Sequence, residues 1–131
     1  ERFQRRAADI VEQAKEASQD GTVFLRNSDN AEDEELPIVA VSFIEALGSL
    51  YSSSGDRSLL QSIRNAMDWF LGANRKKESL YDFSTCGCYD AITASGVNEN
   101  QGAESTLAFH LARVEMKLCE HRVDVGGSDP A

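Results

Sequence analysis

The sequence predicts an all-α protein built from antiparallel helical hairpins, with one long, ordered polar loop before the last helix. Apolar residues recur at helical spacing in several segments. Breaks rich in Gly, Asp and Ser separate these segments, and the chain shows no βαβ pattern. Because the chain has 131 residues, of which 41% are hydrophobic, we expect a single helical domain over residues 1–131 with one modest core.

The first expected helix covers residues 3–18, where apolar side chains fall on one face and charged side chains on the other. An acidic connector at 27–35 follows, and its block of like charge predicts a solvated surface. The second helix begins near Pro37, because a first helical turn does not need the N–H that proline lacks. It covers about residues 36–51, and its apolar side chains on nearly all sides are typical of a helix buried by several neighbours.

The third helix is bounded by residues that favour helix ends. Gly55 is the expected stop of the second helix, and Asp56 or Ser58 can cap the third. Gly72 marks its end. Trp69, close to that end, predicts core packing, with a sugar-stacking surface as the alternative.

The last helix is expected to begin at Glu104 or Ser105, and the segment 122–131 after it to be a loose tail. Its helical spacing predicts one apolar stripe that faces the core. The stripe consists of Leu107, Ala108, Leu111, Ala112, Val114 or Glu115, and Leu118.

The segment between the third and last helices, residues 76–102, is long and rich in polar side chains. A structureless loop of this length is uncommon inside a compact domain, and such loops are usually functional or disordered. Several apolar residues can anchor this one, so we expect it to be ordered and functional. These residues are Leu80, Tyr81, Phe83, Tyr89 and Ile92.

Two stretches carry a resemblance to a known family, AMDWFLGANRKKESLYDFSTCGCYDAI and GVNENQGAESTLAFHLA. They resemble the C-terminal part of a bacterial family of helical-hairpin toroid proteins, often described as glycosyltransferases or sugar-active proteins. The resemblance covers about residues 37–115 and implies a six-hairpin-like (α/α) toroid, of which this chain would be the C-terminal segment. In such a ring, the loops at one end line a pocket for carbohydrate. Cys86 and Ala91 stand where the family pattern has glycine.

The loop at 80–104 is therefore expected to bind or process a sugar through planar polar side chains and aromatic rings. Its candidate ligand-binding residues are Asp82, Tyr89, Asn98, Asn100 and Gln101. Glycoside hydrolysis requires two carboxyl groups, and Asp90 and Glu104 form the candidate catalytic pair. Enzymatic activity is left open. An active protein would be a hydrolase or epimerase-like enzyme rather than a nucleotide-sugar transferase, because the nucleotide-binding α/β pattern is missing.

These residues also have structural interpretations. The asparagines and the glutamine could satisfy backbone groups of a partly buried loop, and the helix dipole favours an acid at Glu104. Cys86 and Cys88 could bind a metal, but no second ligand pair follows at zinc-like spacing. We therefore predict no metal and no cofactor, and Cys88 as a small buried residue.

The net charge and the cysteine content limit the partners and the location that we expect for this protein. A net charge of −9 disfavours nucleic acid and anionic membranes, and no run of apolar residues is long enough to span a bilayer. Three cysteines, an odd number, are not typical of a disulfide framework, so we expect a cytoplasmic protein. The alternative function is a helical interaction module without activity of its own. Its exposed apolar flanks would pair with another copy in a homo-oligomer, or with the remainder of a larger chain.

Overall fold

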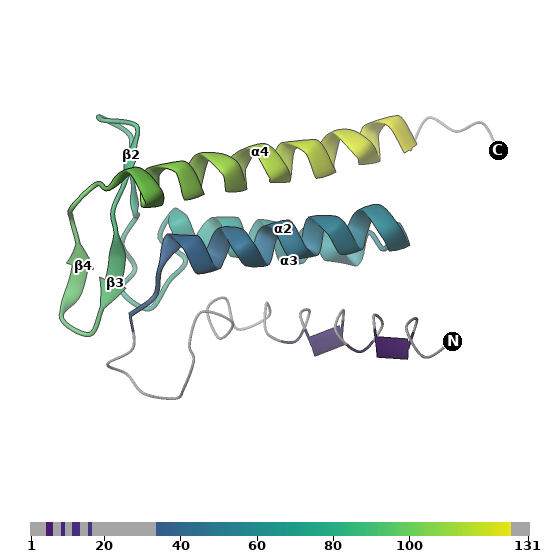
Figure 1. Ribbon diagram of the computed structural model, residues 1–131, viewed down its shortest axis with the longest axis horizontal. Coiled ribbons are helices and arrows are strands. Elements are labelled where there is room, and N and C mark those ends of the chain that lie inside the picture. Colours follow the sequence, from purple (N-terminus) through teal and green to yellow (C-terminus); the bar gives the residue numbers. More distant parts are fainter. Residues whose placement is uncertain (1–4, 7–8, 10–11, 14–15, 17–33, 127–131) are drawn as a thin grey trace.

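Helices packed side by side, with two small β-hairpins at one end, make up the protein in the computed structural model (Figure 1). The structure describes residues 34–126 and, before them, residues 5–6, 9, 12–13 and 16. Within 34–126 the helices are α2 (Pro37–Ser54), α3 (Ser58–Phe70) and α4 (Ala103–Gly126). α2 and α4 both begin at the end that carries the hairpins, and α3 returns to that end (Figure 1).

The hairpins form in the segment predicted as a loop. Strand β1 (Tyr81–Asp82) pairs antiparallel with β2 (Gly87–Cys88), and β3 (Ala91–Thr93) pairs antiparallel with β4 (Gly96–Asn98). The prediction of an all-α toroid segment is therefore wrong, because the described part of the chain is mixed α/β. The strands were not predicted from the sequence, because each has only two or three residues, too few to show a periodic pattern.

Local signals set both ends of α2 as predicted. α2 begins at Pro37 and ends before Gly55, which has a φ of 67° and donates its N–H to the carbonyl of Tyr51. The carboxylate of Asp56 accepts the backbone N–H of Ser58 at 3.0 Å, at the start of α3. The predictions for Pro37 and Gly55 are confirmed, because each depends only on residues close in sequence. The predicted cap of α3 is not confirmed, since its N-cap residue is Arg57 and this residue makes no side-chain cap hydrogen bond.

Two predicted segments fall partly beyond the described residues. Of the first expected helix, 3–18, the residues that are described are helical, and the others lie outside the described part. The expected tail at 122–131 begins inside α4, which extends to Gly126, and residues 127–131 are not among those described.

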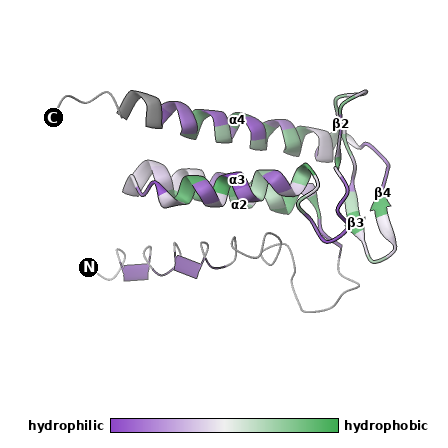
Figure 2. Ribbon diagram, turned by 180° about the vertical axis from the view of Figure 1, so that it is seen from behind, coloured by the Kyte–Doolittle hydropathy of each residue, from purple (hydrophilic) through white to green (hydrophobic). Residues whose placement is uncertain are grey.

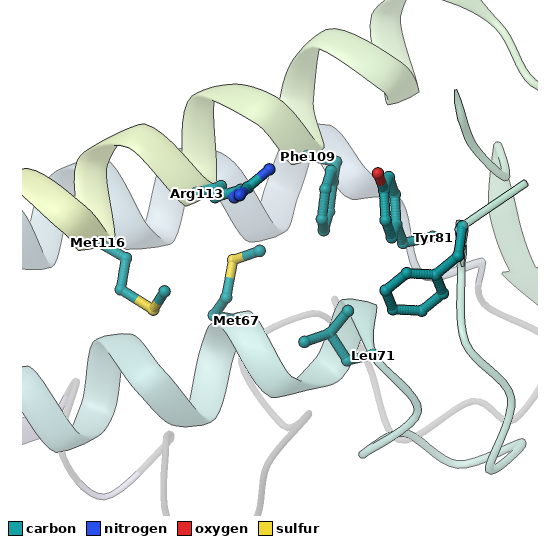
Figure 3. A pocket seen from close by; sticks show the side chains of 7 residues that line it. Met67, Leu71, Tyr81, Phe109, Arg113 and Met116 are labelled. Carbon is teal, nitrogen blue, oxygen red and sulfur yellow. The ribbon is translucent and has the colours of Figure 1, made fainter. Parts of the chain in front are cut away.

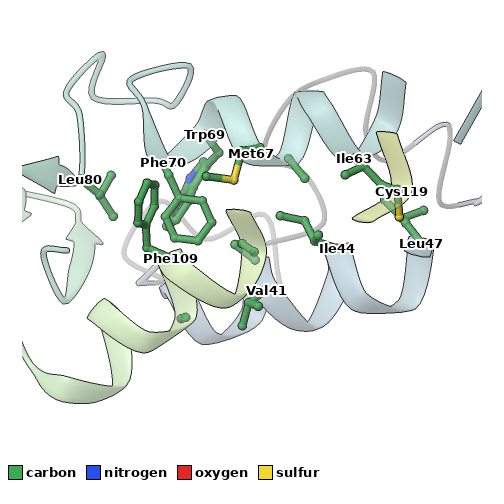
Figure 4. Packing of buried hydrophobic residues seen from close by; sticks show 14 of the residues in the cluster. Val41, Ile44, Leu47, Ile63, Met67, Trp69, Phe70, Leu80, Phe109 and Cys119 are labelled. Carbon is green, nitrogen blue, oxygen red and sulfur yellow. The ribbon is translucent and has the colours of Figure 1, made fainter. Parts of the chain in front are cut away.

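The hydrophobic core lies between α2, α3 and α4 (Figure 4). Trp69 and Phe70 are fully buried at the C-terminal end of α3, with ring centroids 5.0 Å apart in an edge-to-face arrangement. Phe70 also meets the edge of Phe109 from α4, at 5.5 Å. Core packing of Trp69 is thus confirmed. Burying one large apolar side chain contributes about 1.5–3 kcal/mol, so this aromatic group holds α3 and α4 together.

The acidic connector is not solvated along its whole length, and its prediction as surface is wrong at Glu35, which is fully buried. The Glu35 carboxylate accepts the indole N–H of Trp69 at 3.0 Å and pairs with Arg75 Nε at 3.4 Å. The backbone N–H and carbonyl of Glu35 both pair with Ile92 of β3, each at 2.9 Å. Glu35 therefore ties the start of α2 to α3, to β3 and to the chain after α3. Residues 27–33 of the connector lie outside the described residues.

Candidate functional site

The predicted site residues gather at one end of the molecule, where the two hairpins meet the start of α4 (Figure 1). β2 contacts α4, and the segment after β4 leads directly into that helix. The arrangement places polar side chains from both hairpins around the first turn of α4.

Asp90 lies at the centre of this end, between β2 and β3. One carboxylate oxygen accepts the backbone N–H of Gly102 at 2.8 Å and the hydroxyl of Ser105, and the other accepts the side-chain amide of Asn100. The hydrogen bonds from Ser105 and Asn100 lower the pKa of Asp90 below its ordinary value. Asp90 thus caps the start of α4 as an ionised carboxylate and is unsuited to donating a proton.

The close contact between Asp90 and the N-terminus of α4 requires a glycine. A Cβ on Gly102 would lie 2.8 Å from the nearer carboxylate oxygen of Asp90. Any larger residue at position 102 would push that carboxylate away from the helix. The close contact of Asp90 with Gly102 is therefore part of the structure of this end of the protein.

Asp82 makes an equivalent set of contacts in the first hairpin. Its carboxylate accepts the backbone N–H and the hydroxyl of Ser84, at 2.8 and 2.6 Å, and the side-chain amide of Gln101 at 3.1 Å. The hydrogen bonds from Ser84, followed by that from Gln101, lower the pKa of Asp82 to about 2. Gln101 also accepts the hydroxyl of Thr85 at 2.8 Å, so its amide joins the first hairpin to the start of α4.

The remaining predicted ligand-binding residues have mixed roles. The side-chain oxygen of Asn98 accepts the backbone N–H of Asn100 at 3.1 Å, so Asn98 satisfies a backbone group, as its structural interpretation proposed. Tyr89 is half-buried, and this burial, with the charges of Asp82 and Glu99, raises the pKa of its hydroxyl. The structure therefore brings the polar residues together, but most of their hydrogen bonds hold the hairpins and α4 in place.

A pocket of about 370 Å³ lies between the start of α2 and the start of α4. Asp90 and Glu104, the predicted catalytic pair, both line it, and Glu104 is exposed there. The other lining residues are Leu36, Pro37, Ile38, Gly102, Ala103 and Ser105. The end of the molecule where the hairpins meet the start of α4 is here called the polar end. At this end, the pocket gives the described residues a concave surface that is lined in part by exposed polar groups.

The two neighbouring cysteines differ in environment. Cys88 is fully buried, and desolvation, with the nearby charge of Asp90, raises its thiol pKa to about 12, so it is confirmed as a small buried residue. Cys86 is exposed. Among the described residues, no group of three His, Cys, Asp or Glu side chains lies close enough to hold a metal ion.

Cys86 adopts a left-handed backbone conformation with a φ of 61°, which favours glycine over other residues. We expect Cys86→Gly to be more stable than Cys86→Ala by about 1 kcal/mol, because both variants lose the thiol and only glycine relieves the backbone strain. Urea denaturation of the two variants measures this difference. Equal stability would show that the left-handed conformation carries no strain.

The predicted apolar stripe of α4 divides between two faces. Its small members, Ala108 and Ala112, are buried in the core together with Phe109 and Cys119. Its large members are exposed by 47–62% of their surface. These residues, here called the outer stripe, are Leu107, Leu111, Val114 and Leu118.

A groove between α3 and α4 was not predicted from the sequence (Figure 3). Its signal is present in the chain, because Phe109, Arg113 and Met116 recur at helical spacing and Tyr81 and Phe83 at strand spacing. The groove contains Met67, Leu71, Tyr81, Phe83, Phe109, Arg113 and Met116.

Comparison of the chain with models of protein families, with characterised proteins and with solved structures finds no match. The described residues define a small mixed α/β protein, with a core of packed helices and two β-hairpins at one end. None of its described helices combines the length and the apolar character that crossing a membrane requires.

Proposed function

We propose that this protein is a helical interaction module that associates with a second copy of itself through α4. The observation that carries the proposal is the outer stripe, four large aliphatic side chains exposed on one face of a helix whose other face is in the core. Figure 2 shows hydrophobic and hydrophilic residues alternating along α4. Exposed apolar patches of this kind are typical of interaction surfaces.

The spacing of the outer stripe favours another helix as its partner. Its residues follow one another at intervals of four, three and four, the repeat with which helices pack in a coiled coil. An antiparallel second copy would bring Leu107 opposite Leu118, and Leu111 opposite Val114. Arg122, at the far end of the stripe, donates to the hydroxyl of Ser52 in its own α2 at 2.6 Å, so the aliphatic contacts carry the association.

We expect the protein to form a concentration-dependent dimer, and the double variant Leu111→Glu/Val114→Glu to remain a monomer, because buried carboxylates would face each other across the seam. Sedimentation velocity over a range of concentrations measures the change. Because four residues make a short seam, the dimer should be weak.

The control is Val39→Glu, which places one such carboxylate at an exposed aliphatic residue of α2 and should leave the dimer unchanged. A protein that stays monomeric at all concentrations, or a double variant that dimerises as the original does, would remove the proposal. A monomer would favour the alternative in which the outer stripe pairs with the remainder of a longer chain.

Carbohydrate binding at the polar end is a second candidate function. The pocket that Asp90 and Glu104 line supports it, together with the sequence resemblance to sugar-active proteins. If the site processes glycosides, Glu104 is the candidate proton donor and Asp90 the ionised carboxylate, because the hydrogen bonds of Asp90 lower its pKa. A cytoplasmic location fits the three free cysteines.

For this candidate we expect mono- or oligosaccharides to produce saturable heat in calorimetric titrations, and Glu104→Gln to weaken that binding about tenfold, since a charge-assisted hydrogen bond is lost. Glu120→Gln, far along α4, is the control for the loss of charge. Flat titrations across a panel of neutral and acidic sugars would exclude the pocket as a carbohydrate site.

A further inference from the structure

The groove between α3 and α4 has a volume of about 380 Å³ and is separate from the pocket at the polar end. In Figure 3, Met67 projects from α3 and Leu71 lies directly after that helix, and Phe109, Arg113 and Met116 project from α4. Small-molecule sites in proteins are typically mostly apolar, with few polar groups, and measure about 300–1,000 Å³. This groove has that character and lies at the small end of the range.

Aromatic rings close one end of the groove. Tyr81 stacks on Phe109 with centroids 4.2 Å apart and planes 13° apart, and the ring of Phe83 meets Tyr81 edge to face at 4.8 Å. Phe83 is 76% exposed, although a phenylalanine side chain gains free energy from burial. A planar ring entering the groove would cover Phe83 and gain edge or face contacts with it.

Arg113 is the charged residue of the groove. It is exposed, and within the described part of the chain no carboxylate forms an ion pair with it. A guanidinium group presents paired N–H donors that match a carboxylate. The net charge of −9 disfavours anions at long range, so an anion would be held here by contact with Arg113 rather than by the overall field.

We propose that this groove binds a small planar aromatic carboxylate, with its ring against the exposed side chains of Phe83 and Leu71 and its carboxylate on Arg113. The two methionines can adjust their unbranched side chains to the shape of the ring. This site goes beyond self-association through the outer stripe and does not depend on it, because the groove and the outer stripe share no residue.

The two methionines of the chain, Met67 and Met116, provide a direct test because both line the groove. The full chain is labelled with ¹³C at the methionine methyl groups and titrated with 2-naphthoate or with the neutral 2-naphthamide. We expect both methyl signals to shift saturably, and the carboxylate to bind about tenfold more tightly than the amide, since a charged hydrogen bond contributes about 1.5 kcal/mol or more.

Three variants assign the two parts of the ligand. Arg113→Gln should abolish the preference for 2-naphthoate while 2-naphthamide still binds, and Lys117→Gln, the same change of charge one turn further along α4, should preserve it. Phe83→Ala should weaken the binding of both ligands. Because the Phe83 side chain is exposed, the substitution should leave the fold intact. Methyl signals that do not move, equal binding of the two ligands, or an Arg113→Gln variant that keeps the preference would each overturn the proposal.

Discussion

Replacing Glu35 by alanine should lower the free energy of unfolding by about 3–5 kcal/mol, the range for removing one partner of a buried ion pair. Glu35 is fully buried, and the side chain of Arg75 is 14% exposed, so the guanidinium would lose a carboxylate that water can replace only in part. The indole N–H of Trp69 would lose its acceptor as well. The variant should therefore loosen the start of α2 and the C-terminal end of α3 together.

Glu34→Ala is the control for this experiment, because Glu34 has the same charge, precedes Glu35 directly and is exposed. Surface substitutions of this kind change stability by no more than about 0.5 kcal/mol. Urea denaturation followed by the fluorescence of Trp69, the single tryptophan of the chain, measures both variants. A loss of the same size for Glu34 and Glu35 would show that overall charge, rather than the buried contacts, determines the effect.

Replacing Asp90 by alanine should destabilise the protein by about 1–2 kcal/mol, the usual value of a helix cap, and should do so mainly at the start of α4. The variant removes the acceptor of the Gly102 N–H and leaves the donors of Ser105 and Asn100 without it. Amide hydrogen exchange should therefore accelerate in the first turn of α4 more than in α3. Uniform acceleration over both helices would contradict a local capping role.

The contribution of Asp90 should also depend on pH in a defined direction. Because the pKa of Asp90 is lowered in the folded state from its ordinary value of 3.8, folding favours the ionised form. Its stabilising contribution is therefore complete well above pH 3.8 and is lost as the pH falls below that value. Asp82, with a pKa of about 2, acts in the same direction. The loss of stability between pH 5 and pH 2 should thus be smaller in Asp90→Asn than in the original protein.

The Asp90→Asn variant also separates the effect of the charge of Asp90 on stability from the effect of its shape. Asparagine keeps an oxygen that can accept the Gly102 N–H, but its amide would face the donating amide of Asn100. Denaturation measured at several pH values should show a smaller stability loss than alanine causes at neutral pH. Identical pH profiles for Asp90→Asn and the original protein would mean that the charge of Asp90 does not stabilise the fold.

For the candidate site, the sequence predicted which residues take part but not how they pair. The sequence placed Asp82, Asn100 and Gln101 in one segment as candidates for ligand binding, together with Asp90 as a candidate catalytic residue. The structure brings them together, but it pairs Asp82 of the first hairpin with Gln101, and Asp90 with Asn100 at the two ends of the second hairpin. Which polar group faces another and which faces solvent depends on strand pairing. Residue types and spacing alone carry no information on that pairing.

In α4, likewise, the sequence predicted the helix, and only the tertiary structure determined which of its faces is buried. Periodicity correctly predicted that Leu107, Ala108 and Ala112 belong to a helix, but it assigned all of them to a core-facing stripe. In the structure, α2 and α4 pack closely enough that a Cβ on Gly48 would meet the side chain of Glu115. Ala108 and Ala112 therefore lie on the inner face of α4 beside Phe109, and the large aliphatic side chains of the outer stripe remain exposed.

The sequence by itself determined the features that depend on near neighbours: the start of α2 at Pro37 and its end at Gly55. Only the tertiary structure decided the burial of Glu35, which looked like one more acid in a charged connector. Its partners, Trp69 and Arg75, follow it by 34 and 40 residues. A buried charge is stable only beside such partners, and a local pattern cannot show which distant residues the fold will bring to it.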